Sequence, residues 1–165
     1  MIRIVKCSSG DTRTAAGEVS FEEFERANDL HRGDVRNVMN MLAGDIEDAG
    51  REHDRTKKRY EKVFYEQFME TLRSGKDDFK EKSWYQDHIR KERHHLNDHV
   101  PDNVDLIDVL EMISDCVCAG LARSGSVREI KIDPEVLEKA VENTAKYIES
   151  QCIVVEEKDE ELFFI

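Results

Sequence analysis

The segment DLIDVLEMISDCVCAGLARSG, residues 105–125, is the most apolar helical stretch of the sequence. Its apolar residues recur every three or four positions, which is the pattern of one buried face of an α-helix. They are Leu106, Leu110, Ile113, Val117 and Leu121. Asp105 is suited to open this helix, and Gly120 and Gly125 are suited to close it. The segment therefore predicts a long helix with one buried stripe.

Helical patterns extend to both sides of this segment. Ser20 and Glu23 have capping-box spacing, and an apolar stripe follows them from Phe21 to Ile46, with Gly33 and Gly44 as the places where it could break. Further helices are predicted at about 56–72, at 83–96 and at 134–150, the last opened by a proline at its first position. Apolar alternation in 1–7 and 153–155 indicates short terminal strands or extended segments. The predicted fold class is mostly α.

The length of 165 residues predicts a single domain over 1–165. Within it we expect a helical core at 20–125 and a C-terminal helix with a tail at 126–165. Only 2 prolines and 8 glycines interrupt a sequence in which 38% of residues are charged, and that balance is typical of helical proteins with a solvated exterior. The tail 151–165 could cap the core or meet a partner.

The composition limits the partners of the protein. A formal charge of −12 disfavours duplex nucleic acid and favours divalent cations, and the best basic patch is 51–59. The 4 cysteines have no spacing of a secreted disulfide framework, and no signal peptide precedes them. No apolar run approaches the ~20 residues that span a bilayer. We therefore expect a cytoplasmic protein that does not enter the membrane.

His53-Asp54 is the first candidate for chemistry. Adjacent side chains on a helix point about 100° apart, so these two can reach one metal only around a helix terminus or from a bent backbone. An imidazole with a carboxylate suits Mn, Fe, Co, Ni or Zn better than calcium. Lys57, three residues after Asp54, could hold a phosphate oxygen near such a metal.

Three more histidines form a second cluster. His88 and His95 are two turns apart on the predicted 83–96 helix and would share a face, with His94 close to it. Three imidazoles within eight residues indicate a metal or phosphate site, although a solvated basic turn is the alternative. His99, before a proline loop, is expected to face solvent.

A line of carboxylates runs along the apolar helix. Asp108, Glu111 and Asp115 fall at i, i+3 and i+7. Asp108 is explained as an acid near the helix N-terminus. A bare Asp115 carboxylate would be costly to bury, so it indicates either a metal ligand or a structural ion pair.

In this order, His31, His53-Asp54 with Lys57, and Asp115 resemble the signature of the HD phosphohydrolase superfamily. The frame HDxTK, WxxxH, ERHHL and NxxLIDVLEMISD is also similar to a family of small HD-like proteins of bacteria and phages. The similarity covers about residues 20–125. It implies an HD-like helical bundle that holds one or two divalent metal ions.

The resemblance also implies roles for individual residues. His53, Asp54 and Asp115 would be the core metal ligands, with His31 as the fourth. A second metal or the phosphate would be faced by His88, His94 and His95. The implied activity is metal-dependent hydrolysis of a small phosphorylated molecule, most simply a nucleotide, with Asp54 and Lys57 in the catalytic machinery.

Two questions stay open at the level of sequence. His31 and His53 are 22 residues apart, so both can bind one metal only if the chain reverses near Gly44 or Gly50. Without a reversal, His31 is a core residue, and His88 or His95 takes its place. The alternative function is a non-catalytic HD-like scaffold or interaction protein with a structural metal site.

Overall fold

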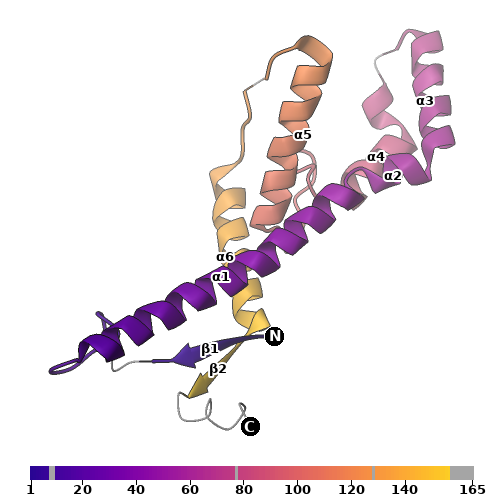
Figure 1. Cartoon of the computed structure of the whole chain (residues 1–165). Coiled ribbons are helices and arrows are strands. Elements are labelled where there is room, and N and C mark those ends of the chain that lie inside the picture. Colours follow the sequence, from indigo (N-terminus) through magenta and orange to yellow (C-terminus); the bar gives the residue numbers. More distant parts are fainter. Residues whose placement is uncertain (8–9, 77, 128, 157–165) are drawn as a thin grey trace. The chain divides into compact units, whose positions relative to one another are not determined.

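Helices dominate the computed structural model, which describes residues 1–7, 10–76, 78–127 and 129–156 (Figure 1). The helices are α1 (Phe21–Glu52), α2 (Arg55–Arg59), α3 (Glu61–Ser74), α4 (Ser83–Lys91), α5 (Leu106–Ser124) and α6 (Pro134–Gln151), with a 3-10 turn, η1, at Phe79–Glu81. The strands are β1 (Ile2–Lys6) and β2 (Cys152–Glu156). The prediction of a mostly α fold with short terminal strands is confirmed.

The chain divides into two compact units, which we describe separately. Unit 1 comprises Met1–Gly44 with Ala145–Ile165, and unit 2 comprises Asp45–Thr144. The single domain over 1–165, with its 20–125 core, stays a prediction. In unit 1, β1 and β2 pair in parallel, from Ile2 opposite Cys152 to Lys6 opposite Glu156. The end of the tail, 157–165, lies outside the described residues.

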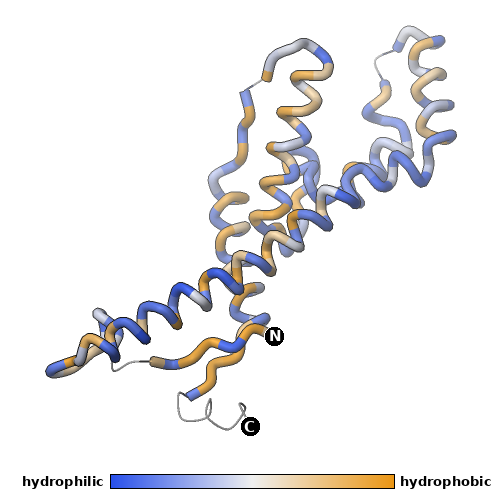
Figure 2. The backbone as a smooth tube through the Cα atoms, viewed as in Figure 1, coloured by the Kyte–Doolittle hydropathy of each residue, from blue (hydrophilic) through white to orange (hydrophobic). Residues whose placement is uncertain are grey.

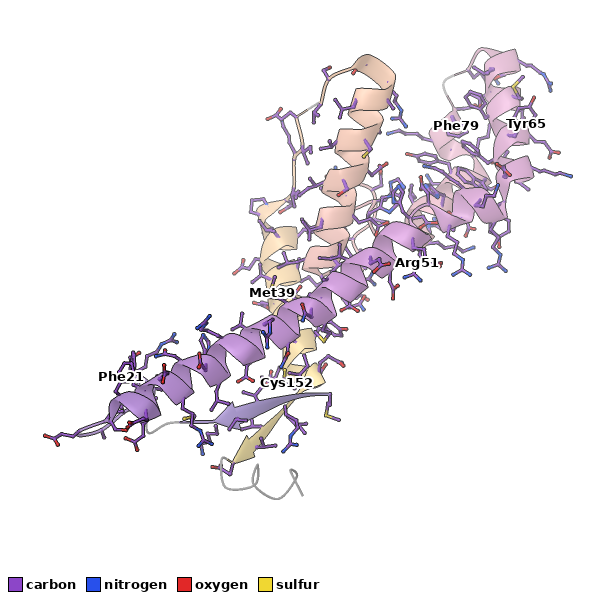
Figure 3. The ribbon with its side chains drawn as sticks, in the orientation of Figure 1. Phe21, Met39, Arg51, Tyr65, Phe79 and Cys152 are labelled. Atoms are coloured by element: carbon purple, nitrogen blue, oxygen red, sulfur yellow. The ribbon has the colours of Figure 1, made fainter. Side chains whose placement is uncertain are left out.

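Helix α1 begins with the predicted capping box. The Ser20 amide donates to Glu23 Oε2 at 2.9 Å, and the Glu23 amide donates to Ser20 Oγ at 3.2 Å. The helix then continues without a break through both glycines that the sequence marked as possible breaks. Of the predicted apolar stripe only Ala27 is fully buried among the described residues: Phe21 is 71% exposed, and Met39 is 59% exposed (Figure 3). Periodicity identifies an apolar face but supplies nothing to cover it.

The core of unit 2 is built on α5, which is apolar along most of its length (Figure 2). The buried members of this core are Leu96, Val104, Val109, Met112 and Ala140. The Asp105 capping box and the left-handed Gly125, with a φ of 71°, bound the helix as predicted. The predicted buried stripe is wrong at two positions, since Leu110 is 46% exposed and Leu121 is 52% exposed. The core partners on α6 and on the 96–104 loop face the side of α5 that carries Val109 and Met112.

Two predicted helices are shorter than the sequence indicated. The 56–72 segment is two helices, α2 and α3, separated at Tyr60. The predicted 83–96 helix ends at Lys91, because Glu92 adopts an extended backbone with φ −86° and ψ 113°. His94 and His95 therefore lie in a turn, and the expectation that they share a helix with His88 is wrong.

Aromatic side chains join α3, η1 and α4. The Phe64 ring lies 4.3 Å from the Trp84 ring, and Phe79 meets Tyr85 edge to face at 5.5 Å. Trp84, the single tryptophan of the chain, stacks on His88 with a centroid distance of 4.9 Å and an interplanar angle of 12°. The aromatic cluster thus fixes one wall around His88.

Within the described part of the chain, no helix has both the length and the apolarity needed to cross a membrane. The four cysteines are free thiols.

Gly10 provides a test of the packing in unit 1. A Cβ at this buried residue would lie 2.1 Å from the Glu23 carbonyl oxygen, so Gly10→Ala forces the backbone apart. We expect it to lower the free energy of unfolding by ~1–3 kcal/mol. The measurement is thermal denaturation followed by circular dichroism.

The matched control is Gly33→Ala in α1, where no described atom lies within 4 Å of the new Cβ. This change should raise stability by ~0.5–1 kcal/mol, because alanine is the better helix former. Equal effects of the two substitutions would contradict the close approach at Gly10.

Candidate metal centre

The candidate site starts in the turn that follows α1, whose last turn carries Arg51 (Figure 3). In this turn Asp54 has a left-handed backbone with a φ of 56°, as does no other non-glycine residue of the described chain. Aspartate tolerates this conformation better than most residues. The bend brings two adjacent side chains together, with His53 Nε2 3.6 Å from Asp54 Oδ2. The sequence expectation of convergence at a helix terminus or bend is confirmed.

Asp54 lies at the centre of the cluster. Its Oδ1 atom is 3.3 Å from His88 Nε2 and 3.9 Å from His94 Nε2. Its Oδ2 atom forms an ion pair with Lys57. One carboxylate therefore faces imidazoles from three segments of the chain and a lysine one turn further on.

Glu111 orients two of these imidazoles from α5. Its Oε1 atom is 2.9 Å from His53 Nδ1, with hydrogen-bond geometry, and 2.9 Å from His94 Nδ1. A carboxylate at Nδ1 favours the tautomer whose Nε2 lone pair is available to a metal. In the sequence Glu111 stood out only as part of the carboxylate line, and its place one turn before Asp115 was the signal that assigns it to the site.

Asp115 joins the cluster from the next turn of α5. Its Oδ1 atom is 3.6 Å from His53 Nε2, and its side chain is 34% exposed. The costly burial that the sequence suggested for this carboxylate is therefore only partial. Its contact with His53 brings together two of the three predicted core ligands, which are His53, Asp54 and Asp115.

His88 and His95 complete the cluster from the other side. Their Nε2 atoms are 2.9 Å apart. His88 Nδ1 is 2.6 Å from the Thr56 hydroxyl, which can accept its proton and leave Nε2 free to bind a cation. Thr56 was not foreseen as a site residue, because a threonine in a basic stretch carries no specific signal.

Two contacts hold the turn that carries His94 and His95. Arg93 donates from Nε and Nη2 to both oxygens of Asp108, each at 2.7 Å, and thereby ties this turn to α5. Glu92 Oε1 accepts from the Thr56 amide at 2.7 Å and ties the turn to α2. Asp108 is buried, so its role is more than that of an acid near a helix N-terminus.

His31 is the predicted ligand that the structure does not bring to the cluster. Helix α1 does not reverse at Gly44 or Gly50, and a reversal was the condition for His31 and His53 to share a metal. His31 is instead exposed in unit 1, beside a small cavity lined with Ile4 and Asp34. The alternative assignment of His31 to the core is also wrong, because its side chain is exposed. At the cluster, His88 and His95 lie where the sequence expected His31.

The electrostatics favour the metal-binding forms of these groups. Burial lowers the pKa of His88 to about 4, and burial together with His94 lowers the pKa of His95. Burial alone would raise the pKa of Asp54 and of Glu111, but Lys57 and the imidazoles outweigh it and lower both pKa values. At neutral pH the carboxylates are therefore charged, and His88 and His95 are neutral.

His94 differs from its neighbours. Burial would lower the pKa of His94, but Glu111 and the other carboxylates outweigh it and raise the pKa. Its Nδ1 and Nε2 atoms face Glu111 and Asp54, so His94 is the imidazole of the cluster at which positive charge is most favourable. A divalent metal ion would supply that positive charge and displace the proton.

The donor set fits a metal ion. Within the described residues, two groups have ligand atoms within 4.8 Å of one another: His53, His94 and Glu111, and Asp54, His94 and His95. Ligands at ~2.1 Å from one metal lie ~3.0 Å apart at octahedral angles and ~3.4 Å apart at tetrahedral angles. Among the wider set of candidate ligands, which adds His88 and Asp115, the contacts of 2.9 to 3.9 Å cover that range.

Buried polar atoms support the same conclusion. In the described part of the chain, Asp54 Oδ1 and both ring nitrogens of His94 are buried without a hydrogen bond. Unsatisfied buried polar atoms are costly unless an ion or a water compensates them. His94 Nδ1 has Glu111 at 2.9 Å without hydrogen-bond geometry, so Asp54 Oδ1 and His94 Nε2 are the two atoms whose burial a cation would best compensate.

Fold and site together define a mostly helical protein with a histidine–carboxylate cluster that could hold a divalent metal ion. The chain matches, over residues 20–159, a family described as "Family of unknown function (DUF5662)", and it belongs to that family. No curated protein and no solved structure matches it.

Glu111→Gln tests the orienting carboxylate. The substitution keeps the size of the side chain and removes the charge that fixes His53 and His94, so the affinity for Co²⁺ should fall by roughly 10–100-fold. Binding can be followed by the fluorescence of Trp84, which stacks on His88 and which a bound paramagnetic ion should quench. Glu138→Gln, on the exposed surface of α6, is the control, and an affinity loss shared by both variants would contradict the assignment.

Arg93→Ala tests the clamp on the histidine turn. It leaves the Asp108 carboxylate buried without its partner, so the free energy of unfolding should fall by ~3 kcal/mol or more. Chemical denaturation measures this. Arg90→Ala, at an exposed position of α4, should change stability by less than ~0.5 kcal/mol, and a similarly small effect at Arg93 would show that the clamp is unimportant.

Proposed function

We propose that the protein is a metal-dependent phosphohydrolase of the HD type that acts on a small phosphorylated molecule. The observation that carries the proposal is the convergence of His53, Asp54 and Asp115, the HD core ligands, with Lys57 directly beside Asp54. Three additional imidazoles surround the same carboxylate, which is the ligand richness that hydrolytic metal sites require.

The proposed ligands divide between the two oxygens of Asp54. Its Oδ2 side faces His53, which in turn faces Asp115, and its Oδ1 side faces His88 and His94. His95 joins the Oδ1 side through its contact with His88. A single carboxylate that serves both sides is suited to one metal ion or to two neighbouring ions.

A bound divalent ion would polarise a phosphoryl oxygen and lower the pKa of a water molecule. The chain's own contribution is positioning and charge. Glu111 and Thr56 fix the imidazoles, and Lys57 can turn from Asp54 to a phosphate oxygen, since its side chain is 39% exposed. A lysine at that place stabilises the negative charge that develops during phosphoryl transfer.

The ion class follows from the donor set. Imidazole nitrogens mixed with carboxylate oxygens favour Mn, Fe, Co, Ni or Zn over calcium, which prefers oxygen ligands only. A nucleotide is the substrate that the resemblance to HD enzymes suggests first. The alternative, a scaffold with a structural metal, is supported by the partly buried carboxylates of Asp54, Glu111 and Asp115, whose mutual repulsion a bound metal ion would compensate.

Phosphate release from a panel of phosphomonoesters and nucleotides, with Mn²⁺, Co²⁺ or Ni²⁺, tests the proposal. Lys57→Met should lower the rate by roughly 10²–10³-fold while metal content stays the same, because it removes one charge-stabilising donor and no ligand. Asp54→Asn should abolish both activity and stable metal binding.

Lys58→Met is the matched control for Lys57. Lys58 is the next residue in α2, its side chain is 82% exposed, and it pairs with Glu61 away from the cluster. Equal rates for the two lysine variants would contradict the role of Lys57. Metal binding that raises the melting temperature strongly, without turnover of any ester, would support the structural-metal alternative instead.

A further inference from the structure

An apolar cavity opens beside the candidate metal centre, on the side of Asp115. It has a volume of about 290 Å³. Its apolar wall comes from the end of α1 and from α5: Ile46, Ala49, Gly50, Ile107 and Leu110. At its polar end lie His53, Glu111 and Asp115. A ligand held by the metal centre would therefore extend directly into an apolar space.

We propose that this cavity binds the organic part of the substrate and that this part is an apolar group of one or two rings. The inference rests on the proposed function and specifies which class of phosphoester would be the substrate. An apolar cavity of ~150 Å³ accepts benzene, so about twice that volume fits a bicyclic aryl group or a short branched alkyl chain.

The wall of the cavity away from its polar end disfavours a polar occupant. The Ser114 hydroxyl, at the same cavity, donates to the Leu110 carbonyl at 2.8 Å and so uses its proton. Cys118 adds only a weakly polar thiol. A sugar phosphate would lose the hydration of its hydroxyl groups on this wall without replacing it, and such losses are costly.

The exposure of the wall agrees with a ligand site. Ile46 is 44% exposed, and Leu110 is 46% exposed. Both lie within two turns of the charged cluster. At such exposed positions a polar side chain would be less costly than an apolar one. Apolar surface next to a polar centre is the usual composition of a small-molecule pocket.

A larger cavity of about 390 Å³ also borders Glu111, but its composition differs. It is lined with charged residues that are largely paired with one another, Arg55 with Glu52 and Arg93 with Asp108 among them. Charged side chains make up most of its lining, whereas the smaller cavity carries such groups only at its polar end. The smaller cavity is therefore the one that selects the organic group.

Gly50 allows the cavity to be filled by design. No described atom lies within 4 Å of a Cβ at this position, and the residue lines the cavity. Gly50→Leu places a side chain in that space and also replaces a poor helix former. Gly44→Leu is the matched control, because it is an equally open glycine of α1 outside the cavity.

The test uses the full chain loaded with Mn²⁺ and two probes, 1-naphthylphosphonate and methylphosphonate, which share the head group and differ in the apolar part. Binding is measured calorimetrically, without any need for turnover. The naphthyl compound should bind at least about tenfold more tightly. Gly50→Leu should remove that preference and leave the affinity for methylphosphonate unchanged, whereas Gly44→Leu should change neither.

A second pair keeps the test independent of one glycine. Leu110→Ser should weaken naphthylphosphonate binding severalfold, while Leu121→Ser, at an exposed position of α5 outside the cavity, should not. Equal affinity for the two phosphonates, or a preference that Gly50→Leu leaves intact, overturns the inference while the metal site and its hydrolysis stand. Binding of neither phosphonate, with no ester hydrolysed, overturns the proposed function as well.

Discussion

The Glu111 carboxylate and the imidazoles of His53 and His94 form the contact on which the site depends. Both Nδ1 atoms lie 2.9 Å from the same Oε1 atom, so one side chain of α5 sets the ring orientation of residues from two other segments. Each imidazole then directs its Nε2 atom toward the carboxylate of Asp54. Glu111 thus joins both the turn after α1, through His53, and the turn after α4, through His94, to the core helix α5.

The buried charges also explain why the rest of unit 2 is built as it is. Arg93 neutralises Asp108 with two hydrogen bonds, and Lys57 neutralises part of the charge of Asp54. The remaining carboxylates face histidines, one of which, His94, has a raised pKa. Such a cluster is poised to exchange a proton for a metal ion, because the cation lowers the cost of keeping several carboxylates together.

The surroundings of the cluster give it two different boundaries. On the His88 side, Trp84 stacks on the imidazole, and the aromatic rings of α3 and α4 keep that wall closed. On the Asp115 side, the wall is an open apolar cavity. Such asymmetry suits the proposed hydrolysis of a phosphoester, in which the ligands are held rigidly while the substrate retains access.

The sequence by itself determined the helical class, the capping box at Ser20 and the start of α5 at Asp105, and it made His53, Asp54 and Asp115 candidate site residues. These depend on local rules: helix periodicity, capping chemistry and the cost of burying a carboxylate. It did not determine where helices stop inside a polar stretch. Glu92 leaves the helical conformation where its side chain accepts from the Thr56 amide, a contact between residues 36 positions apart that no local pattern records.

Only the tertiary structure decided which histidines meet. The sequence left His31 open between a metal ligand and a core residue, but α1 does not reverse, and His31 belongs to unit 1 whereas the cluster belongs to unit 2. Glu111 was one acid in a line, and its partners became visible only when two turns folded onto α5. Ligand choice depends on distances between segments, and residue spacing along the chain fixes those distances only within one continuous helix or strand.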